Sequence, residues 1–116
     1  MPLIDITCAP SVSDATKWAL VNEIPEIVSN AVECEAEPYD GALQPGDVIV
    51  RFRSVGAFDR FDLDVLVEVH SKWFQDRAQN RQERVAAVLA GVEAIVAPHT
   101  VGVYLSLPVA AWDQTE

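Results

Sequence analysis

Basic residues are scarce in this chain. Only 8 Lys and Arg stand against 18 Asp and Glu among 116 residues, so the formal net charge is −10. A surface this acidic repels phosphate backbones and anionic lipid headgroups, so we expect neither nucleic acid nor a membrane surface as a partner. No apolar run approaches the roughly 18 residues that a membrane span needs.

Metal-binding, redox and targeting patterns are also missing. The two cysteines, Cys8 and Cys34, fit no metal-ligand or redox spacing, and we expect both to be reduced packing residues. Asp64, Glu68 and His70 share one face of a predicted strand, yet no metal motif surrounds them, so we expect no metal site. There is no glycine-rich phosphate loop and no nucleophile elbow. The N-terminus has no basic region followed by an apolar stretch, which predicts a cytoplasmic protein.

What remains is a globular composition with an uneven charge distribution. Half of the residues are apolar, and 116 residues are enough for one core, so we expect a single domain spanning 1–116. Seven of the eight cations lie within residues 51–84. Such a cluster either builds an anion site or pairs with nearby acids on a solvated face. Arg77, Arg81 and Arg84 lie near one face of a predicted helix and leave the same two interpretations open.

Hydrophobic periodicity divides the chain into two similar halves. Alternation with a period of two predicts strands at Leu3–Cys8, Val48–Val55, Leu63–His70 and Val101–Leu107. The acidic segment Cys34–Gly46 contains two prolines and two glycines, which predicts a loop.

A helix is predicted between the two strands of each half. Ser11 or Ser13 would cap the first helix, and Pro25 inside it should kink the helix or split it in two. Asp76 and Gln79 form a capping-box-like start for the second, whose apolar stripe continues until a proline stops it.

This order of elements fits two architectures of the α/β (α+β) class. One joins two right-handed parallel β-α-β units into a four-stranded mixed sheet with both helices on one face. The other is the ferredoxin-like βαββαβ arrangement, whose strands are antiparallel. Periodicity alone does not separate them.

The proline at position 2 could carry chemistry. Removal of Met1 is expected when the next residue is this small, and it would leave Pro2 with a free secondary amine. An α-amino group has a pKa of about 7.7–8.0, and an apolar or cationic site lowers that pKa. Such an amine suits general acid–base catalysis. The simpler interpretation is that Pro2 only stiffens the entry into the first strand.

Arg51 and Arg53 project from one face of the second predicted strand. Two neighbouring guanidinium groups can bind a carboxylate in a forked arrangement. Cross-strand pairing with Asp64 or Glu68 is the other interpretation, and it needs no ligand.

The chain resembles the tautomerase superfamily in several motifs. These are the opening Pro2-Leu3-Ile4-Asp5-Ile6, the doubled strand-helix-strand unit, the Arg51-Phe52-Arg53 strand, and Asp76 through Arg81-Gln82. Within that superfamily it is most similar to the fused-repeat branch of 5-carboxymethyl-2-hydroxymuconate isomerase-like proteins.

The resemblance implies the mixed-sheet architecture, no cofactor, and assembly as a homo-oligomer, usually a homotrimer. It implies enol–keto tautomerisation of a small anionic substrate, a carboxylated enol or 2-hydroxydienoate. Pro2 would act as base and acid, and Arg51 and Arg53 would hold the substrate carboxylate. Lys72 stands where related decarboxylases and dehalogenases tend to have paired arginines, and Trp112 is similar to an aromatic residue that walls the pocket. A decarboxylase or dehalogenase of the same superfamily, and a non-enzymatic ferredoxin-like binding module, are the alternatives.

Overall fold

Strands and helices follow one another in the predicted order. The computed structural model describes residues 1–35 and 46–115, and most of the predicted loop Cys34–Gly46 lies outside them. In this part of the chain the elements are β1 (Leu3–Cys8), α1 (Asp14–Val32), β2 (Ile49–Ser54), β3 (Val65–His70), α2 (Gln75–Gln79), α3 (Arg81–Val96) and β4 (Val101–Ser106). The first strand has its predicted bounds, and the other three are a residue or two shorter than predicted.

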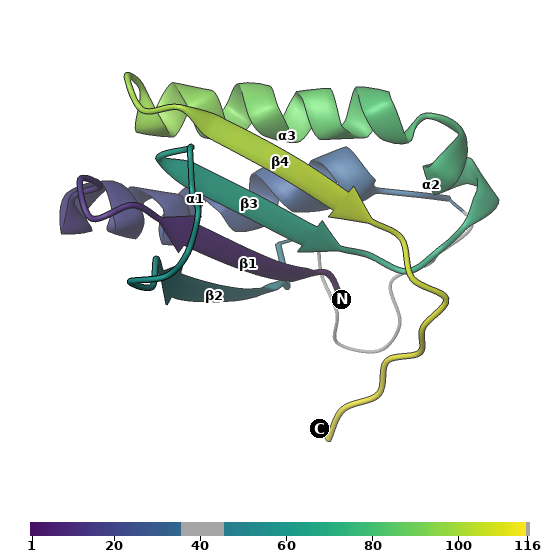
Figure 1. The fold of residues 1–116 in the computed structure, drawn as a ribbon. Helices are drawn as coiled ribbons and strands as arrows, with labels where there is room; N and C mark the ends of the chain where they lie inside the picture. The colour runs from purple at the N-terminus through teal and green to yellow at the C-terminus, as the bar shows by residue number, and fades with distance from the viewer. Residues whose placement is uncertain (36–45, 116) are drawn as a thin grey trace.

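The four strands form a mixed sheet in the order β2-β1-β3-β4. The pairs β1/β2 and β3/β4 are parallel, whereas β1 and β3 are antiparallel. Helices α1 and α3 pack side by side on one face of this sheet (Figure 1). The two β-α-β units predicted from the sequence are therefore confirmed. The ferredoxin-like alternative is wrong, because the two strands that each helix connects are paired directly with each other in parallel.

The core lies between the helices and the covered face of the sheet. Side chains without solvent exposure come from both halves: Ile4, Ile6, Leu20, Ile24, Val28, Val65, Val67, Val69 and Val92. The helices approach closely at Gly91, where a Cβ atom would lie 2.8 Å from Cγ2 of Ile27. Both Cys8 and Cys34 are buried free thiols, and burial raises the pKa of the Cys8 thiol.

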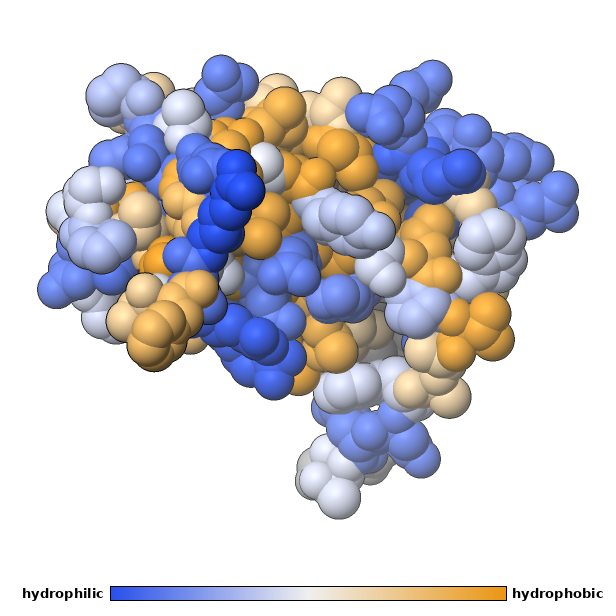
Figure 2. All heavy atoms as spheres, in the orientation of Figure 1, coloured by the Kyte–Doolittle hydropathy of each residue, from blue (hydrophilic) through white to orange (hydrophobic). Residues whose placement is uncertain are grey.

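The opposite face of the sheet, called the open face below, carries no helix. The strand registers arrange its residues in rows across the four strands. The central row runs Arg51, Asp5, Glu68, Tyr104 from β2 to β4. Figure 2 looks toward this side and shows apolar residues at the surface among hydrophilic ones. In the described ranges, no helix is both long enough and apolar enough to cross a membrane.

Pro25 does not split the first helix. Helix α1 continues through it from Asp14 to Val32, and Ser13 is the N-cap, accepting a hydrogen bond from the backbone of Thr16. A proline removes one backbone hydrogen bond from a helix interior. Buried Leu20, Ile24 and Val28 lie before and after this position, so packing on the sheet holds both helical segments in line.

The second helical region begins differently from its prediction. Helix α2 starts at Gln75 with Phe74 as a cap that makes no side-chain hydrogen bond. The capping box assigned to Asp76 and Gln79 is therefore wrong. A new helix, α3, starts after Asn80. The two helices bury different side chains. Helix α2 contains a buried charged residue, whereas α3 contributes valines to the core.

That charged side chain is Arg77, which together with Arg84 caps the C-terminus of α1. Nε of Arg77 donates to the carbonyl of Val32 at 2.8 Å. Nη1 of Arg84 donates to the carbonyls of Ala31 at 3.0 Å and Glu33 at 2.6 Å. The last turn of α1 contains no basic residue of its own. Cations from another part of the chain thus satisfy carbonyls that a helix end leaves without partners, which differs from both sequence interpretations of these arginines.

Replacing this cap should weaken the packing of the two halves. We expect Arg84→Ala to lower the free energy of unfolding by about 1–3 kcal/mol, because two carbonyls lose a charged donor. Arg81→Ala is the matched control, since within residues 1–35 and 46–115 the hydrogen bond of the Arg81 side chain is local, to the carbonyl of Ala78, and its loss should cost about 0.5 kcal/mol or less. Urea denaturation of both variants measures the difference, and equal losses would show that the cap contributes nothing.

A second polar connection joins the start of β3 to the start of β4. The backbone N–H of Thr100 donates to Oδ2 of Asp64 at 3.0 Å, and the backbone N–H of Asp64 donates to Oγ1 of Thr100 at 3.0 Å. Nδ1 of His99 lies 3.3 Å from the same carboxylate oxygen. The Thr100 backbone hydrogen bond, with a smaller contribution from His99, holds the pKa of Asp64 below its ordinary value.

This depressed pKa predicts a loss of stability in acid. A carboxyl group with a lowered pKa in the folded state stabilises the fold above its unfolded pKa, and that contribution disappears as the pH falls through the folded pKa. We therefore expect the melting temperature of Asp64→Asn to fall less than that of the wild type between about pH 5 and about pH 3. Asp62→Asn is the control, because Asp62 is an exposed acid that pairs loosely with the exposed Arg60, at 3.7 Å. Identical acid sensitivity in the wild type and Asp64→Asn would refute this role.

Candidate functional site

Pro2 is mounted at the start of the central strand pair. Its carbonyl accepts a hydrogen bond from the backbone N–H of Ile49 at 3.2 Å, so the ladder between β1 and β2 extends to this residue. On the other side of β1, Leu3 pairs with His70, the last residue of β3. Continuing this antiparallel register by one residue places Pro2 opposite Ser71. Figure 1 shows the N-terminus beside the tip of β3.

The segment that follows β3 lies next to Pro2 and is firmly held. Its hydrogen bonds run from Ser71 N to Ser106 O (3.0 Å), from Trp73 N to Pro108 O (2.9 Å) and from Arg77 Nη1 to Lys72 O (2.6 Å). Arg77 is only 2% exposed. Pro2 directly precedes β1 and Lys72 follows β3 by two residues, and the antiparallel pairing puts the start of β1 beside the end of β3. The structure therefore brings two predicted site residues, Pro2 and Lys72, to the same end of the sheet.

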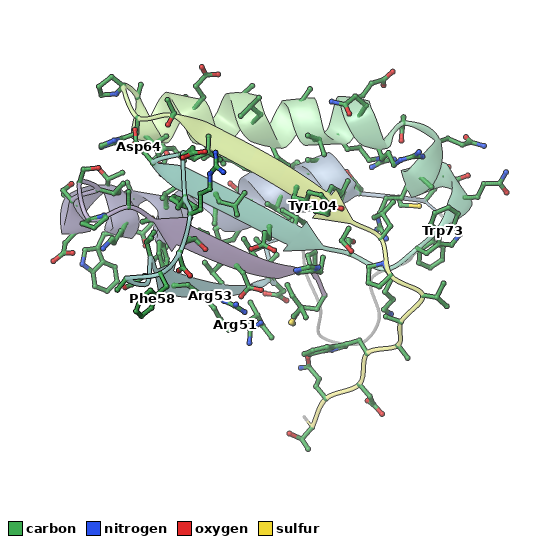
Figure 3. The ribbon with its side chains drawn as sticks, viewed as in Figure 1. Arg51, Arg53, Phe58, Asp64, Trp73 and Tyr104 are labelled. Atoms are coloured by element: carbon green, nitrogen blue, oxygen red, sulfur yellow. The ribbon has the colours of Figure 1, made fainter. Side chains whose placement is uncertain are left out.

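Arg51 and Arg53 lie elsewhere, in a cluster around Asp5 on the open face. Nε and Nη2 of Arg51 donate to the two carboxylate oxygens of Asp5 at 3.0 and 3.3 Å. Nη2 of Arg53 and Nε2 of His70 approach Oδ2 of Asp5 at 3.8 and 3.9 Å. The side chain of Asp5 is 7% exposed, whereas those of Arg51 and Arg53 are 60% and 62% exposed. Figure 3 shows both arginines projecting from β2.

Pairing of these arginines with Asp64 or Glu68 is a prediction that the structure contradicts. Strand β2 lies beside β1 and not beside β3, so the acid within reach of Arg51 is Asp5. Glu68 occupies the next position in the same row and has no hydrogen bond or ion pair with any residue in the described ranges. Asp64 lies at the far end of β3, where Thr100 bonds it (Figure 3).

Trp112 lies in the C-terminal segment that leaves the sheet after β4. Its indole Nε1 donates to Oε1 of Gln114 at 3.1 Å, and its side chain is half-buried. In Figure 1 this segment runs away from the sheet. The backbone N–H of the exposed Trp73, in the segment after β3, donates a hydrogen bond to the carbonyl of Pro108 and so holds the start of this C-terminal segment.

Asp5 is a functional candidate that the sequence analysis passed over. The sequence does carry a signal for it: Asp5 lies between Ile4 and Ile6 in an apolar strand, and a buried charge needs a partner. In residues 1–35 and 46–115, no group of three or more His, Cys, Asp or Glu side chains is arranged to hold a metal ion.

Comparisons with known proteins show a shared fold. No protein-family model matches this chain, and no curated protein does. Solved structures do match. One is malonate semialdehyde decarboxylase, with a TM-score of 0.67 at 14% identity over 98% of this chain and 91% of that one. That protein was solved as the wild type, as a variant with its first-position proline replaced by alanine, and in an inactivated form.

Two further matches cover most of this chain. A fused 4-OT described as a symmetric trimer has a TM-score of 0.58 at 15% identity, over 91% of this chain and 85% of that one. A macrophage migration inhibitory factor-like protein from Entamoeba histolytica has a TM-score of 0.62 at 11% identity, over 98% and 96%. Identities this low establish a common architecture, the four-stranded mixed sheet with both helices on one face.

The arginine cluster predicts that two neighbouring acids, Asp5 and Glu68, contribute differently to the free energy of unfolding. We expect Asp5→Asn to lower the free energy of unfolding by about 1–3 kcal/mol, because a shared and buried acceptor loses its charge. Glu68→Gln, in the same row but without a partner in the described ranges, should change it by about 0.5 kcal/mol or less. Chemical denaturation at neutral pH compares them, and an equal or larger loss in Glu68→Gln would contradict the cluster.

Proposed function

We propose that this protein is a cofactor-independent isomerase, an enol–keto tautomerase acting on a small carboxylated enol or 2-hydroxydienoate. The placement of Pro2 is the observation that carries the proposal. Its carbonyl is tied to β2, and the register sets it opposite Ser71, beside the rigid segment that carries Lys72. The fold is common to this chain and to malonate semialdehyde decarboxylase, of which a proline-to-alanine variant was made.

The chemistry needs one group that accepts a proton and returns it. Once Met1 is removed, the secondary amine of Pro2 takes the proton from the enol oxygen, and the electron pair of that O–H bond forms the carbonyl. The electron pair of the C=C bond then takes a proton from the protonated amine to form the new C–H bond, so the enzyme ends as it began. A cation such as Lys72 lowers the pKa of a neighbouring amine and stabilises the negative charge that develops on the substrate oxygen.

Arg51 and Arg53 lie on the open face, whereas Pro2 follows Ile4 to the covered side. In the proposed homotrimer they would hold the carboxylate of a substrate bound at the Pro2 of another copy. A guanidinium group has five N–H donors, and Asp5 occupies two of those on Arg51. Both side chains are more than half exposed, so donors remain that face solvent. In this role Asp5 keeps the two cations oriented, and Trp112 would wall the pocket from the C-terminal segment.

Assembly into a homotrimer belongs to the same proposal. The open face presents the exposed Ile49 and Tyr104, and β2 and β4 are edges of the sheet. Uncovered edges and apolar sheet faces favour association with further copies. The fused 4-OT with the same fold is described as a symmetric trimer.

The segment after β3 favours tautomerisation over decarboxylation or dehalogenation. Its second cation, Arg77, is buried and directs donors to the main-chain carbonyls of Val32 and Lys72. The paired cations that the dehalogenase and decarboxylase interpretation requires after the third strand would therefore have to come from elsewhere. A proton transfer assisted by Lys72 has no such requirement.

Ultraviolet assays of ketonisation, with 2-hydroxymuconate or phenylenolpyruvate as substrate, test the proposal. The intact mass should first show a chain that begins at Pro2. We expect Pro2→Ala to lower kcat by about 10²–10⁴-fold, the usual contribution of a general acid–base group. Arg51→Ala and Arg53→Ala should mainly raise KM, because they bind the carboxylate.

Arg60→Ala is the matched control, since Arg60 is an exposed arginine just beyond β2 and should leave both constants unchanged. Equal rates in the wild type, Pro2→Ala and Arg51→Ala would end the catalytic assignment. A retained Met1 would do the same, because it converts the amine into an amide.

A further inference from the structure

Ser71 carries a buried hydroxyl group without a partner. The residue is 4% exposed, and its backbone N–H donates to Ser106. Its Oγ makes no hydrogen bond with any residue in the ranges that the structure describes. Burying an unpaired hydroxyl costs free energy, and native proteins avoid it unless the group has another use.

The other buried polar side chains of the described ranges all have partners. Asp5 binds Arg51, Arg77 donates to Val32, and the hydroxyl of Ser29 accepts from the backbone of Gly46 at 2.8 Å. Ser71 is the exception among the four. An exception of this kind points to a partner that is present only in another state of the protein, such as the chain after removal of Met1.

The register identifies what lies opposite this hydroxyl. Ile4 pairs with Val69 on the covered side of the sheet. Pro2 comes two residues before Ile4, and Ser71 comes two residues after Val69, so the antiparallel register sets them opposite each other. Because side chains alternate between the faces, both residues follow Ile4 and Val69 on the same side. Opposite residues of an antiparallel pair have Cα atoms about 4.5–5.5 Å apart, so this extended register sets the Ser71 side chain next to the ring of Pro2.

Both residues are also held in place. The carbonyl of Pro2 accepts from Ile49, and the main chain on either side of Ser71 is tied to β4 and its extension. Arg77 fixes the next carbonyl, that of Lys72. Little conformational freedom remains to be lost when the hydroxyl meets a charged amine, which is the condition for an effective catalytic contact.

We propose that Ser71 is a further catalytic residue, whose hydroxyl accepts a hydrogen bond from the protonated amine of Pro2. This inference rests on the proposed function, since it requires the free amine. After the amine has taken the enol proton it carries two N–H bonds. One donates to Ser71 and the other faces the substrate carbon, so the serine orients the proton that is returned. No atom is transferred to the serine itself.

The direct test is the titration of the Pro2 amine by NMR, in protein labelled with ¹⁵N-proline and confirmed by mass to begin at Pro2. Removing an acceptor from the charged form destabilises that form, so we expect Ser71→Ala to lower the pKa of the amine by about one pH unit. Ser71→Thr keeps a hydroxyl and should restore most of the shift. Ser106→Ala, at the neighbouring position on β4, should leave the amine unchanged.

Two further measurements separate this role from a structural one. In Ser71→Ala, kcat should fall about tenfold while KM changes by less than about twofold, because the contact forms with the charged amine. The melting temperature should stay the same or rise, because the variant loses a buried hydroxyl that has no internal partner. A lower melting temperature with an unmoved amine pKa would make Ser71 a structural residue and overturn the inference.

The failure of this inference and the failure of the proposed function are distinguishable. A shifted pKa in Ser71→Ala, in a protein that ketonises no enol, would support the contact and refute the activity. An active wild type whose amine pKa and kcat do not respond to Ser71→Ala would leave the activity standing and refute the contact.

Discussion

The antiparallel pairing of β1 with β3 determines which side chains meet in this protein. It joins the two β-α-β halves, since each half is internally parallel. It also brings the start of the chain to the end of β3, and this sets Pro2 opposite Ser71. On the open face the same register sets Asp5 beside Glu68. A shift by a single residue would turn both pairs to the wrong faces, so the buried rows of Ile and Val also fix the geometry of the candidate site.

A second connection links the rigidity of that site to the stability of the fold. Arg77 bonds the carbonyl of Val32 at the end of α1 and the carbonyl of Lys72 after β3. Its guanidinium carbon lies 5.5 Å from the ring centre of Phe74, a cation–π contact. One buried cation therefore stabilises a helix end and positions the segment beside Pro2. The first helix and the candidate site are coupled through this side chain.

Local patterns in the sequence predict what depends on local structure. The period-two alternation from Leu3 to Cys8 matches β1 residue for residue, because one face of that strand is buried. Ser13 is one of the two predicted caps, since its hydroxyl bonds a backbone N–H three residues away. The unbroken course of α1 through Pro25 could not be predicted this way, because packing against residues distant in sequence holds it.

The side-chain partners across strands could not be predicted from the sequence. Arg51 and Arg53 were correctly placed on one strand face, yet their partner depends on which strand lies beside β2. The solitary acid in the first strand, Asp5, signals only that some cation must be near. Ser71 gives no signal at all, because its isolation is visible only once burial and register are known.

The uneven distribution of positive charge has a largely structural explanation. Among the seven cations of residues 51–84, Arg51 and Arg53 are oriented by Asp5, and Arg77 and Arg84 cap a helix. This leaves the segment beside Pro2 with the charge of Lys72 rather than a cluster of guanidinium groups. Each further cation lowers an amine's pKa again and so makes it a weaker base. In the proposed tautomerase, a single cation would leave the Pro2 amine able both to take up and to return a proton near neutral pH, as reversible tautomerisation demands.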